Sequence, residues 1–379
     1  MKKVLDFLKK EPMLPLSLFI AAAGLLITPP SGALLEQIDW RTLGILLMML
    51  CVLEGFKQED VLRPLVRLAG RLKTMAGLSL FLVFGVFFSS MFVTNDVSLL
   101  IFVPLTILLF RSAGKEGYIL PVISMENIAA IRGSLLTPFG SPQNLFLYGQ
   151  VRISVWKFLL HMLPLCAMSA VLLAAFVLVL YRKDLKETYD GEARLTQASE
   201  RGFRWWMYLG LFVLVLAVIV TRTRWWYIAL GAVLLTIAAA DRKLFLKVDY
   251  VLLVTFLCFF VFSSSITRNA AIAGFLEKSV AGNEFWWAIG LSQVISNVPA
   301  GIVLYPFTRN FAGLIYGLDT AGLCSLIGSL ASVINYRIYV REYPGQGKAF
   351  IKTFTLVSWA FFLLVVIPGF LLSAWDFFS

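Results

Sequence analysis

Apolar stretches long enough to cross a lipid bilayer recur along almost the whole chain. A membrane-spanning helix needs about 20 mainly apolar residues to cross a hydrocarbon core of about 30 Å. Stretches of this kind lie at 14–30, 42–56, 118–149, 157–181, 205–221, 225–240, 249–264, 318–340 and 353–375. Two more, at 76–110 and 283–308, contain polar interruptions. The pattern predicts an all-α polytopic membrane protein.

The composition and the distribution of charge agree with this prediction. The chain is 59% hydrophobic and 15% charged, which is far from the composition of a soluble domain. Its net charge of +11 would suggest nucleic acid as a partner of a soluble protein, but we expect none here. If the N-terminus is cytoplasmic, 24 of the 33 Lys and Arg residues fall in cytoplasmic segments or at their borders. This asymmetry predicts a multi-pass protein of the inner membrane with its basic loops inside.

No motif in the chain points to an enzyme or to a cofactor. The four cysteines are single residues within apolar segments, which is typical of buried thiols and not of disulfides or zinc sites. The sequence has no nucleotide-binding loop, no HExxH and no nucleophile elbow. We therefore expect neither catalysis nor a bound cofactor. The run 14–30 is expected to be the first span and not a cleaved signal.

The apolar stretch 76–110 is too long to be one spanning helix. Its 35 residues would form a helix of about 52 Å, well beyond the hydrocarbon thickness. The polar triplet TND at 94–96 is where the chain can break. Two shorter helices meeting there would form a re-entrant hairpin, with irregular backbone buried in protein or lining a wet cavity. The stretch 283–308, interrupted at 296–297, is expected to form a second hairpin.

Three pairs of landmarks recur in the same order in the two parts of the chain. They are Asp39 and Asp249, the S-x3-[ST]-N-x8-P pattern beginning at Ser90 and Ser292, and the Gly-Ser pairs at 140–141 and 328–329. The landmarks predict two repeats of about the same architecture. The span 205–221 adds one crossing, which inverts the second repeat. Inverted repeats with broken helices are typical of secondary transporters.

The predicted organisation has three parts, with about nine full spans and two hairpins in all. Residues 1–181 form the first repeat, with hairpin 76–110 and broken helix 118–149. Residues 182–224 form a cytoplasmic loop and a linker span. Residues 225–379 form the second repeat, with hairpin 283–308 and broken helix 318–340. A basic amphipathic segment at 59–73 is expected to lie on the inner membrane surface.

The breaks supply the candidate site. Helix ends at a break expose carbonyl groups that suit a cation, or N–H groups with a positive dipole that suit an anion. The candidate substrate- or ion-binding residues are Thr94, Asn95, Asp96, Thr137, Gly140, Ser141, Asn144, Ser296, Asn297, Gly328, Ser329 and Ser332. The alternative is that these breaks are kinks whose polar groups are satisfied by neighbouring helices.

Charged residues within the apolar segments need a partner or a function, because a lone charge in the bilayer is costly. Asp96 and Glu126 are candidates for a proton or cation site, and Arg132 for attracting an anion. Glu126 and Arg132 are six residues apart and therefore do not share one helical face. The alternative for each is a structural ion pair with another helix. His161 is expected to be a packed or interfacial residue.

Four segments resemble motifs of the ion transporter superfamily, which includes arsenite permeases, NhaD-type sodium–proton antiporters, and citrate and dicarboxylate transporters. The segments are TNDVSLLIFVPL, TPFGSPQN, SNVPAGIVLYPF and GSLASVIN. The resemblance implies that the tips 94–95 and 296–297 hold substrate and, in sodium-coupled members, Na⁺. It implies that 137–144 and 328–332 are the facing breaks. It also implies a homodimer and an elevator movement.

The predicted function is secondary active transport, coupled to H⁺ or Na⁺. The substrate is expected to be a small carboxylate or inorganic oxyanion, or arsenite or antimonite. One alternative is a sodium–proton antiporter that uses Asp96 and Glu126. Another is a membrane receptor or scaffold that binds a ligand without moving it.

Overall fold

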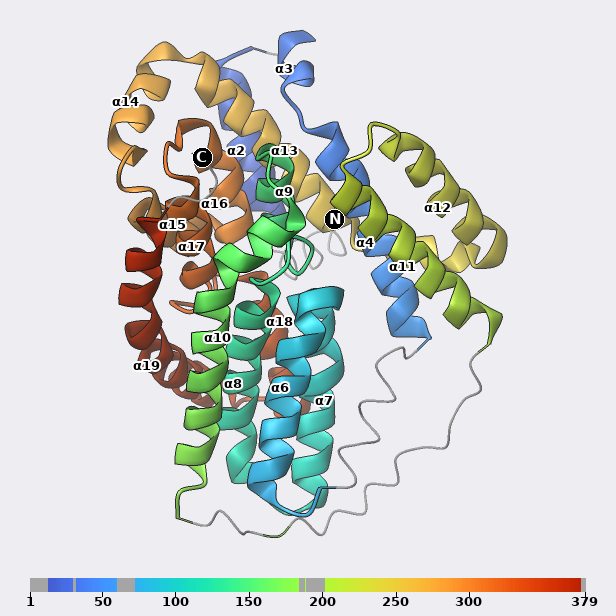
Figure 1. The fold of residues 1–379 in the computed structure, drawn as a ribbon, viewed down its shortest axis with the longest axis vertical. Coiled ribbons are helices and arrows are strands. Elements are labelled where there is room, and N and C mark those ends of the chain that lie inside the picture. Colours follow the sequence, from blue (N-terminus) through green and yellow to red (C-terminus); the bar gives the residue numbers. More distant parts are fainter. Residues whose placement is uncertain (1–12, 30–31, 60–71, 184–187, 189–201, 376–379) are drawn as a thin grey trace.

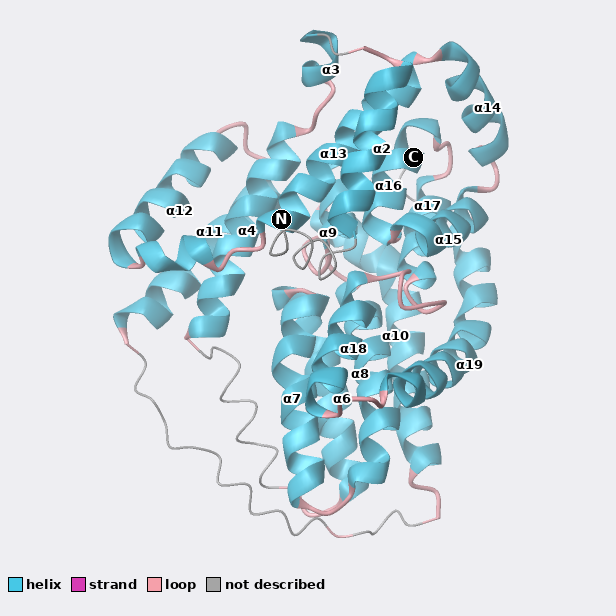
Figure 2. Cartoon of the chain, turned by 180° about the vertical axis from the view of Figure 1, so that it is seen from behind, coloured by secondary structure: helices cyan, strands magenta, loops and turns pink. Residues whose placement is uncertain are grey.

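A computed structural model describes residues 13–29, 32–59, 72–183, 188 and 202–375, and all regular elements in these ranges are helices (Figure 2). The first half contains α2 (Met13–Ile27), α3 (Gly32–Glu36), α4 (Trp40–Gln58), α6 (Met75–Val93), α7 (Asn95–Ser112), η1 (Glu116–Tyr118), α8 (Ile119–Ser134), α9 (Pro142–Gln150) and α10 (Val155–Leu180). The later helices are α11 (Phe203–Thr221), α12 (Trp226–Ala240), η2 (Arg242–Leu246), α13 (Tyr250–Arg268), α14 (Ala270–Val280), α15 (Glu284–Ile295), α16 (Asn297–Leu304), η3 (Tyr305–Phe307), α17 (Phe311–Ala321), α18 (Leu330–Glu342) and α19 (Gly347–Ser373). The predicted all-α class is confirmed.

Several of these helices are long and apolar enough to cross a membrane. Among the described residues, α6, α7, α10, α11, α13 and α19 meet this condition by length and composition, and α2 and α12 are shorter apolar helices. Each predicted apolar run coincides with a helix or with an interrupted helix. The short helix α14, between α13 and α15, has no counterpart among the predicted runs.

The first predicted hairpin breaks where the sequence indicated. α6 ends at Val93 and α7 begins at Asn95, and the two helices lie side by side (Figure 1). Their 19 and 18 residues correspond to about 28 and 27 Å. By length, each arm could therefore cross the bilayer on its own. α15 and α16, with 12 and 8 residues, are too short to do so.

Both predicted broken helices are interrupted. α8 ends at Ser134 and α9 begins at Pro142, whereas α17 ends at Ala321 and α18 begins at Leu330. The second interruption therefore spans 322–329, earlier in the chain than the expected 328–332. Residues 330–332 already form the first turn of α18, because helical backbone resumes directly after Ser329.

The helices pack in corresponding pairs. α6 packs against α8, as α15 packs against α17. α2 packs on α13. α11 and α12 pack on α4, and α4, α11 and α12 lie together on the right in Figure 1. α6, α7, α8 and α10 form a bundle in the lower part of the same view.

Some predictions fall outside the described residues. They include residues 60–71 of the expected surface helix and most of the loop 182–204.

Candidate functional site

The tips of the two hairpins share a backbone conformation that is rare for residues other than glycine. Thr94 has φ 71° and ψ 157°, and Ser296 has φ 71° and ψ 160°. In the described part of the chain, Arg222 is the only other non-glycine residue with positive φ. This region of φ and ψ is almost restricted to glycine and costs about 1–3 kcal/mol for other residues. Strain of this kind is concentrated at functional sites, so both tips qualify as candidates.

Each hairpin contacts the interruption of its own half. The backbone N–H of Asn297 donates to the carbonyl oxygen of Gly328 at 3.2 Å. In the first half, the Thr137 hydroxyl donates to the carbonyl oxygen of Met91 at 2.5 Å. Gly328 must remain without a side chain, because a Cβ there would lie 2.5 Å from the carbonyl oxygen of Ala321.

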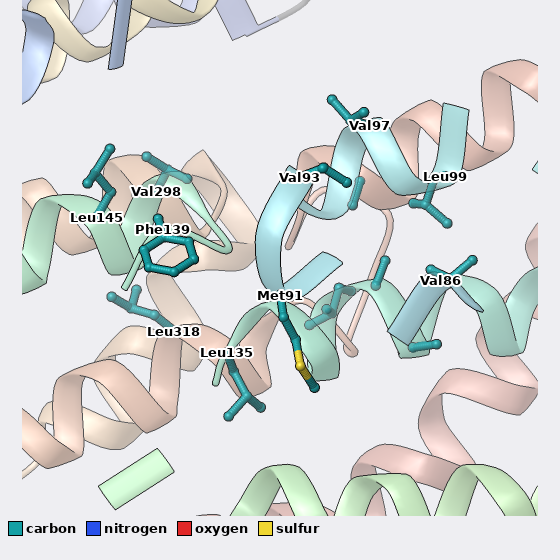
Figure 3. Packing of buried hydrophobic residues seen from close by; sticks show 14 of the residues in the cluster. Val86, Met91, Val93, Val97, Leu99, Leu135, Phe139, Leu145, Val298 and Leu318 are labelled. Carbon is teal, nitrogen blue, oxygen red and sulfur yellow. The ribbon is translucent and has the colours of Figure 1, made fainter. Parts of the chain in front are cut away.

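Gly140 must also remain without a side chain, because a Cβ there would lie 2.3 Å from the carbonyl oxygen of Ser134. Apolar side chains surround this part of the first interruption. Figure 3 shows Phe139 among Leu145, Val298 and Leu318, and the Phe139 ring lies 6.5 Å from that of Phe92 on α6. Packing therefore fixes the interruption from both hairpins.

Two of the predicted site residues, Ser141 and Asn144, use their side chains to hold helix ends. Ser141 caps α9 by accepting from the backbone N–H of Asn144. The Asn144 amide donates to the carbonyl oxygens of Ser134 and Leu135, which lack partners within α8. Ser332 accepts from the Asn127 side chain at 3.0 Å. Ser329 is the N-cap residue of α18, without a side-chain capping bond.

A cavity of about 360 Å³ lies where the two tips approach α13 and α18. Its polar lining comes from Asp96, Asp249, Thr255, Ser296 and Arg337. Within the described part of the chain, the Ser296 hydroxyl and one Asp96 carboxylate oxygen are buried without a hydrogen-bond partner. These two side-chain groups of the tips are therefore available to a ligand in the cavity.

The structure brings together only part of the predicted set in this cavity. Asp96 and Ser296 line it, and Asn95 and Asn297 are buried directly beside them in the chain. Asp249, Thr255 and Arg337 also line the cavity, and sequence reasoning did not identify them as candidate site residues. Asp249 was identified in the sequence as a landmark of the repeat, whereas no local sequence pattern distinguishes Thr255 or Arg337.

Two of the three predicted intramembrane charges, Glu126 and Arg132, do not line the cavity. The Thr106 hydroxyl donates to one oxygen of Glu126, and the other carboxylate oxygen has no partner among the described residues. Arg132 donates to the Ser169 hydroxyl at 3.0 Å and to the carbonyl oxygen of Asp319 at 3.2 Å. Asp319, which is fully buried, was not identified from the sequence.

His161 is packed, as predicted. Its ring lies 5.1 Å from that of Tyr316, whose hydroxyl donates to the His161 carbonyl oxygen at 2.5 Å. The side chain is only 6% exposed.

The comparisons with known proteins agree with this architecture. The family model described as citrate transporter (CitMHS) matches residues 9–328. The chain is 31% identical over 348 residues to the inner membrane protein YbiR of Escherichia coli, covering 88% of this chain and 89% of YbiR. It is 28% identical over 331 residues to the uncharacterised transporter MJ0456 of Methanocaldococcus jannaschii, covering 87% and 88%.

A solved structure has a similar fold. The YdaH transporter of Alcanivorax borkumensis, described as having an unusual topology, superimposes with a TM-score of 0.54 over 96% of each chain. The sequence identity is 15%, so this likeness concerns the fold alone. The family match, in contrast, extends over most of the sequence and includes both hairpins. The chain is therefore a multi-pass membrane transporter of the citrate transporter (CitMHS) family.

Proposed function

We propose that the protein is a secondary active transporter that moves a small anion across the inner membrane. The substrate class is a carboxylate such as citrate, or an inorganic oxyanion, or arsenite. The observation that carries the proposal is the pair of matched tips beside one cavity. Thr94 and Ser296 share one strained backbone conformation, and the cavity is lined by Asp96 from one tip and Ser296 from the other.

Matching backbone geometry supports a repeat of residues 1–181 and 225–379, and we propose that the second copy is inverted. Asp39 and Asp249, the N-caps of α4 and α13, have φ/ψ of −77°/78° and −76°/82°. Ser141 and Ser329, the N-caps of α9 and α18, have −145°/152° and −147°/138°. Together with the tips, all three pairs of sequence landmarks have matching conformations. α11 then supplies the crossing that inverts the second half, and the hairpin-bearing part moves in elevator fashion.

An anion would be bound through helix N-termini at the tips. α7 begins at Asn95 and α16 at Asn297, each directly after a strained tip residue. The first N–H groups of a helix lack intrahelical partners and carry a partial positive charge. The N–H groups of Asp96 and Asn297 already donate within the protein, and Pro299 has none. The N–H groups of Asn95, Val97 and Val298, with the Ser296 hydroxyl, are therefore the donors that we propose for carboxylate or oxyanion oxygens. Proton or sodium coupling completes the proposed cycle.

The charges of the cavity favour a second candidate, a sodium–proton antiporter. Asp96 and Asp249 contribute two carboxylates, against one guanidinium from Arg337. An excess of acidic groups suits a cation better than an anion. A third candidate, a receptor or scaffold, would bind its ligand without moving it.

A ligand screen followed by flux measurement distinguishes these candidates. We expect citrate, another carboxylate, an oxyanion or arsenite to raise the melting temperature of the purified protein, because a ligand that binds the folded state stabilises it. The same solute should then enter proteoliposomes. Stabilisation by Na⁺ alone, with proton movement in the absence of any solute, would favour the antiporter. Stabilisation by a solute that does not cross the membrane would favour the receptor.

The proposed orientation makes a separate prediction. In a background without the native cysteines, Trp375→Cys should react with an impermeant maleimide added outside intact cells, and Lys183→Cys should not. Both positions are exposed, so accessibility of the side chain does not limit the reaction. Labelling of position 183 but not of 375 would reverse the orientation.

A further inference from the structure

Two oppositely charged side chains are buried where the interrupted helices meet. Arg132 lies in the last turn of α8 and Asp319 in the last turn of α17, and both are fully buried. The Gly-Ser landmarks of the two halves are 188 residues apart, so position 132 corresponds to 320, one residue from Asp319. The two halves therefore place opposite charges at nearly equivalent positions.

The contacts of these residues join the two halves. The Arg132 Nε–H donates to Ser169 on α10, and one Nη–H donates to the main-chain oxygen of Asp319. The Gln143 side chain, in the first turn of α9, donates to the Asp319 carboxylate at 3.2 Å. The network thus connects both sides of the first interruption to the helix that leads into the second.

The free-energy cost of burying either charged side chain depends on the presence of the other. A buried guanidinium or carboxylate is costly when its counterion is removed, and the membrane interior increases that cost. Arg132 and Asp319 attract each other across the interface between the halves. Arg132 also lies at the carbonyl end of α17, where the helix dipole favours a cation. Arg132 therefore caps a helix of the other half through the main-chain oxygen of Asp319 and also lies near that residue's carboxylate, although the two charged groups form no direct ion pair in the described part of the chain.

We propose that Arg132, Asp319 and Gln143 form a cross-half clamp that positions the interruptions 135–141 and 322–329 relative to the two tips. We assign the clamp residues a positioning role, since their side chains contact one another and the helix ends and none of them lines the cavity beside Asp96 and Ser296. This inference rests on the proposed function only for its consequence in transport. The geometry of the clamp can be tested without a substrate.

The test combines stability with the accessibility of the cavity. Four variants of the full-length protein are purified: Arg132→Gln, Asp319→Asn, the double variant with both of these changes, and Arg132→Lys. Each variant is made in a cysteine-free background that carries Thr255→Cys as a reporter in the cavity lining. The melting temperature reports folding, and the rate of maleimide labelling at position 255 reports the geometry of the cavity. Each neutralising single variant should melt at lower temperature and change the labelling rate at least tenfold. The double variant and Arg132→Lys should recover most of both properties.

The exposed ion pair of Arg309 and Glu277 provides a matched control, since its side chains are 71% and 56% exposed and 2.8 Å apart. Arg309→Gln and Glu277→Gln should leave both measurements almost unchanged. If the single variants fail to fold, a folded double variant supports the clamp and an unfolded one overturns it. A double variant as damaged as the two singles combined also overturns it. Lower melting temperatures with an unchanged labelling rate would overturn the positioning role. None of these outcomes depends on whether a transported solute has been found.

Discussion

Asn297→Ala is expected to reduce transport by about 10- to 150-fold while leaving the melting temperature almost unchanged. The backbone bond from Asn297 to Gly328 survives the substitution, because it uses only the main-chain N–H. The side chain makes no hydrogen bond within the described part of the chain, so its removal leaves no protein group without a partner. A hydrogen bond to a charged ligand contributes about 1.5–3 kcal/mol, which corresponds to the stated range. Uptake of the identified solute into proteoliposomes measures the effect.

Asn95→Ala should act in the same way from the first half, with a slightly larger effect on stability. The Asn95 side-chain oxygen accepts from the backbone N–H of Asp96 at 2.9 Å, and this bond would be lost. The matched control is Asn335→Ala, since the Asn335 amide donates to the carbonyl oxygen of Ile123 at 2.7 Å in a fully buried position. That variant should melt at lower temperature. Normal transport by both tip variants would show that the tips are structural kinks.

The positions of the two hairpin tips could be predicted because the signals are local. A continuous apolar run of 35 residues exceeds the bilayer, and one polar triplet offers the place to interrupt it. The N-caps Asp39 and Asp249 are equally local, since each caps a backbone N–H three residues ahead. The sequence therefore indicated the order of the elements and the place of the two tips, although it indicated neither the strained backbone of the tips nor the different arm lengths of the two hairpins.

The partners of the buried groups could not be predicted, because they come from distant segments. Asp319 is a single acid in an apolar run, and its partner Arg132 lies 187 residues earlier. Thr255 and Arg337 reach the cavity only after α13 and α18 pack beside the tips. The contacts of several predicted site residues depend in the same way on the folded chain. The side chains of Ser141 and Asn144 are used to satisfy helix ends, a role that depends on how the interruption folds.

Gly133→Ala and Gly317→Ala are expected to cause the largest losses of stability among alanine substitutions of helical glycines. A Cβ at Gly133 would lie 2.0 Å from the carbonyl oxygen of Phe87 on α6, and one at Gly317 would lie 2.5 Å from that of Phe285 on α15. Small residues allow close approach of membrane helices, and a backbone oxygen cannot move aside as the end of a flexible side chain can. Overpacking of this kind costs about 1–3 kcal/mol or more.

Gly210→Ala and Gly290→Ala are the controls, because a Cβ at either position meets nothing within 4 Å. They should be neutral or stabilise by up to about 1 kcal/mol, the difference in helix propensity between alanine and glycine. Denaturation of the purified variants in detergent measures all four. Gly133→Ala should also impair transport, since α6 carries the first tip and α8 leads into the interruption that faces it. If Gly133→Ala were as stable as Gly290→Ala, the close contact between α6 and α8 would be wrong. Similar losses at 133 and 317 would show that both hairpins depend on a close helix contact of this kind, although the two contacts lie one helical turn apart, since position 133 corresponds to 321.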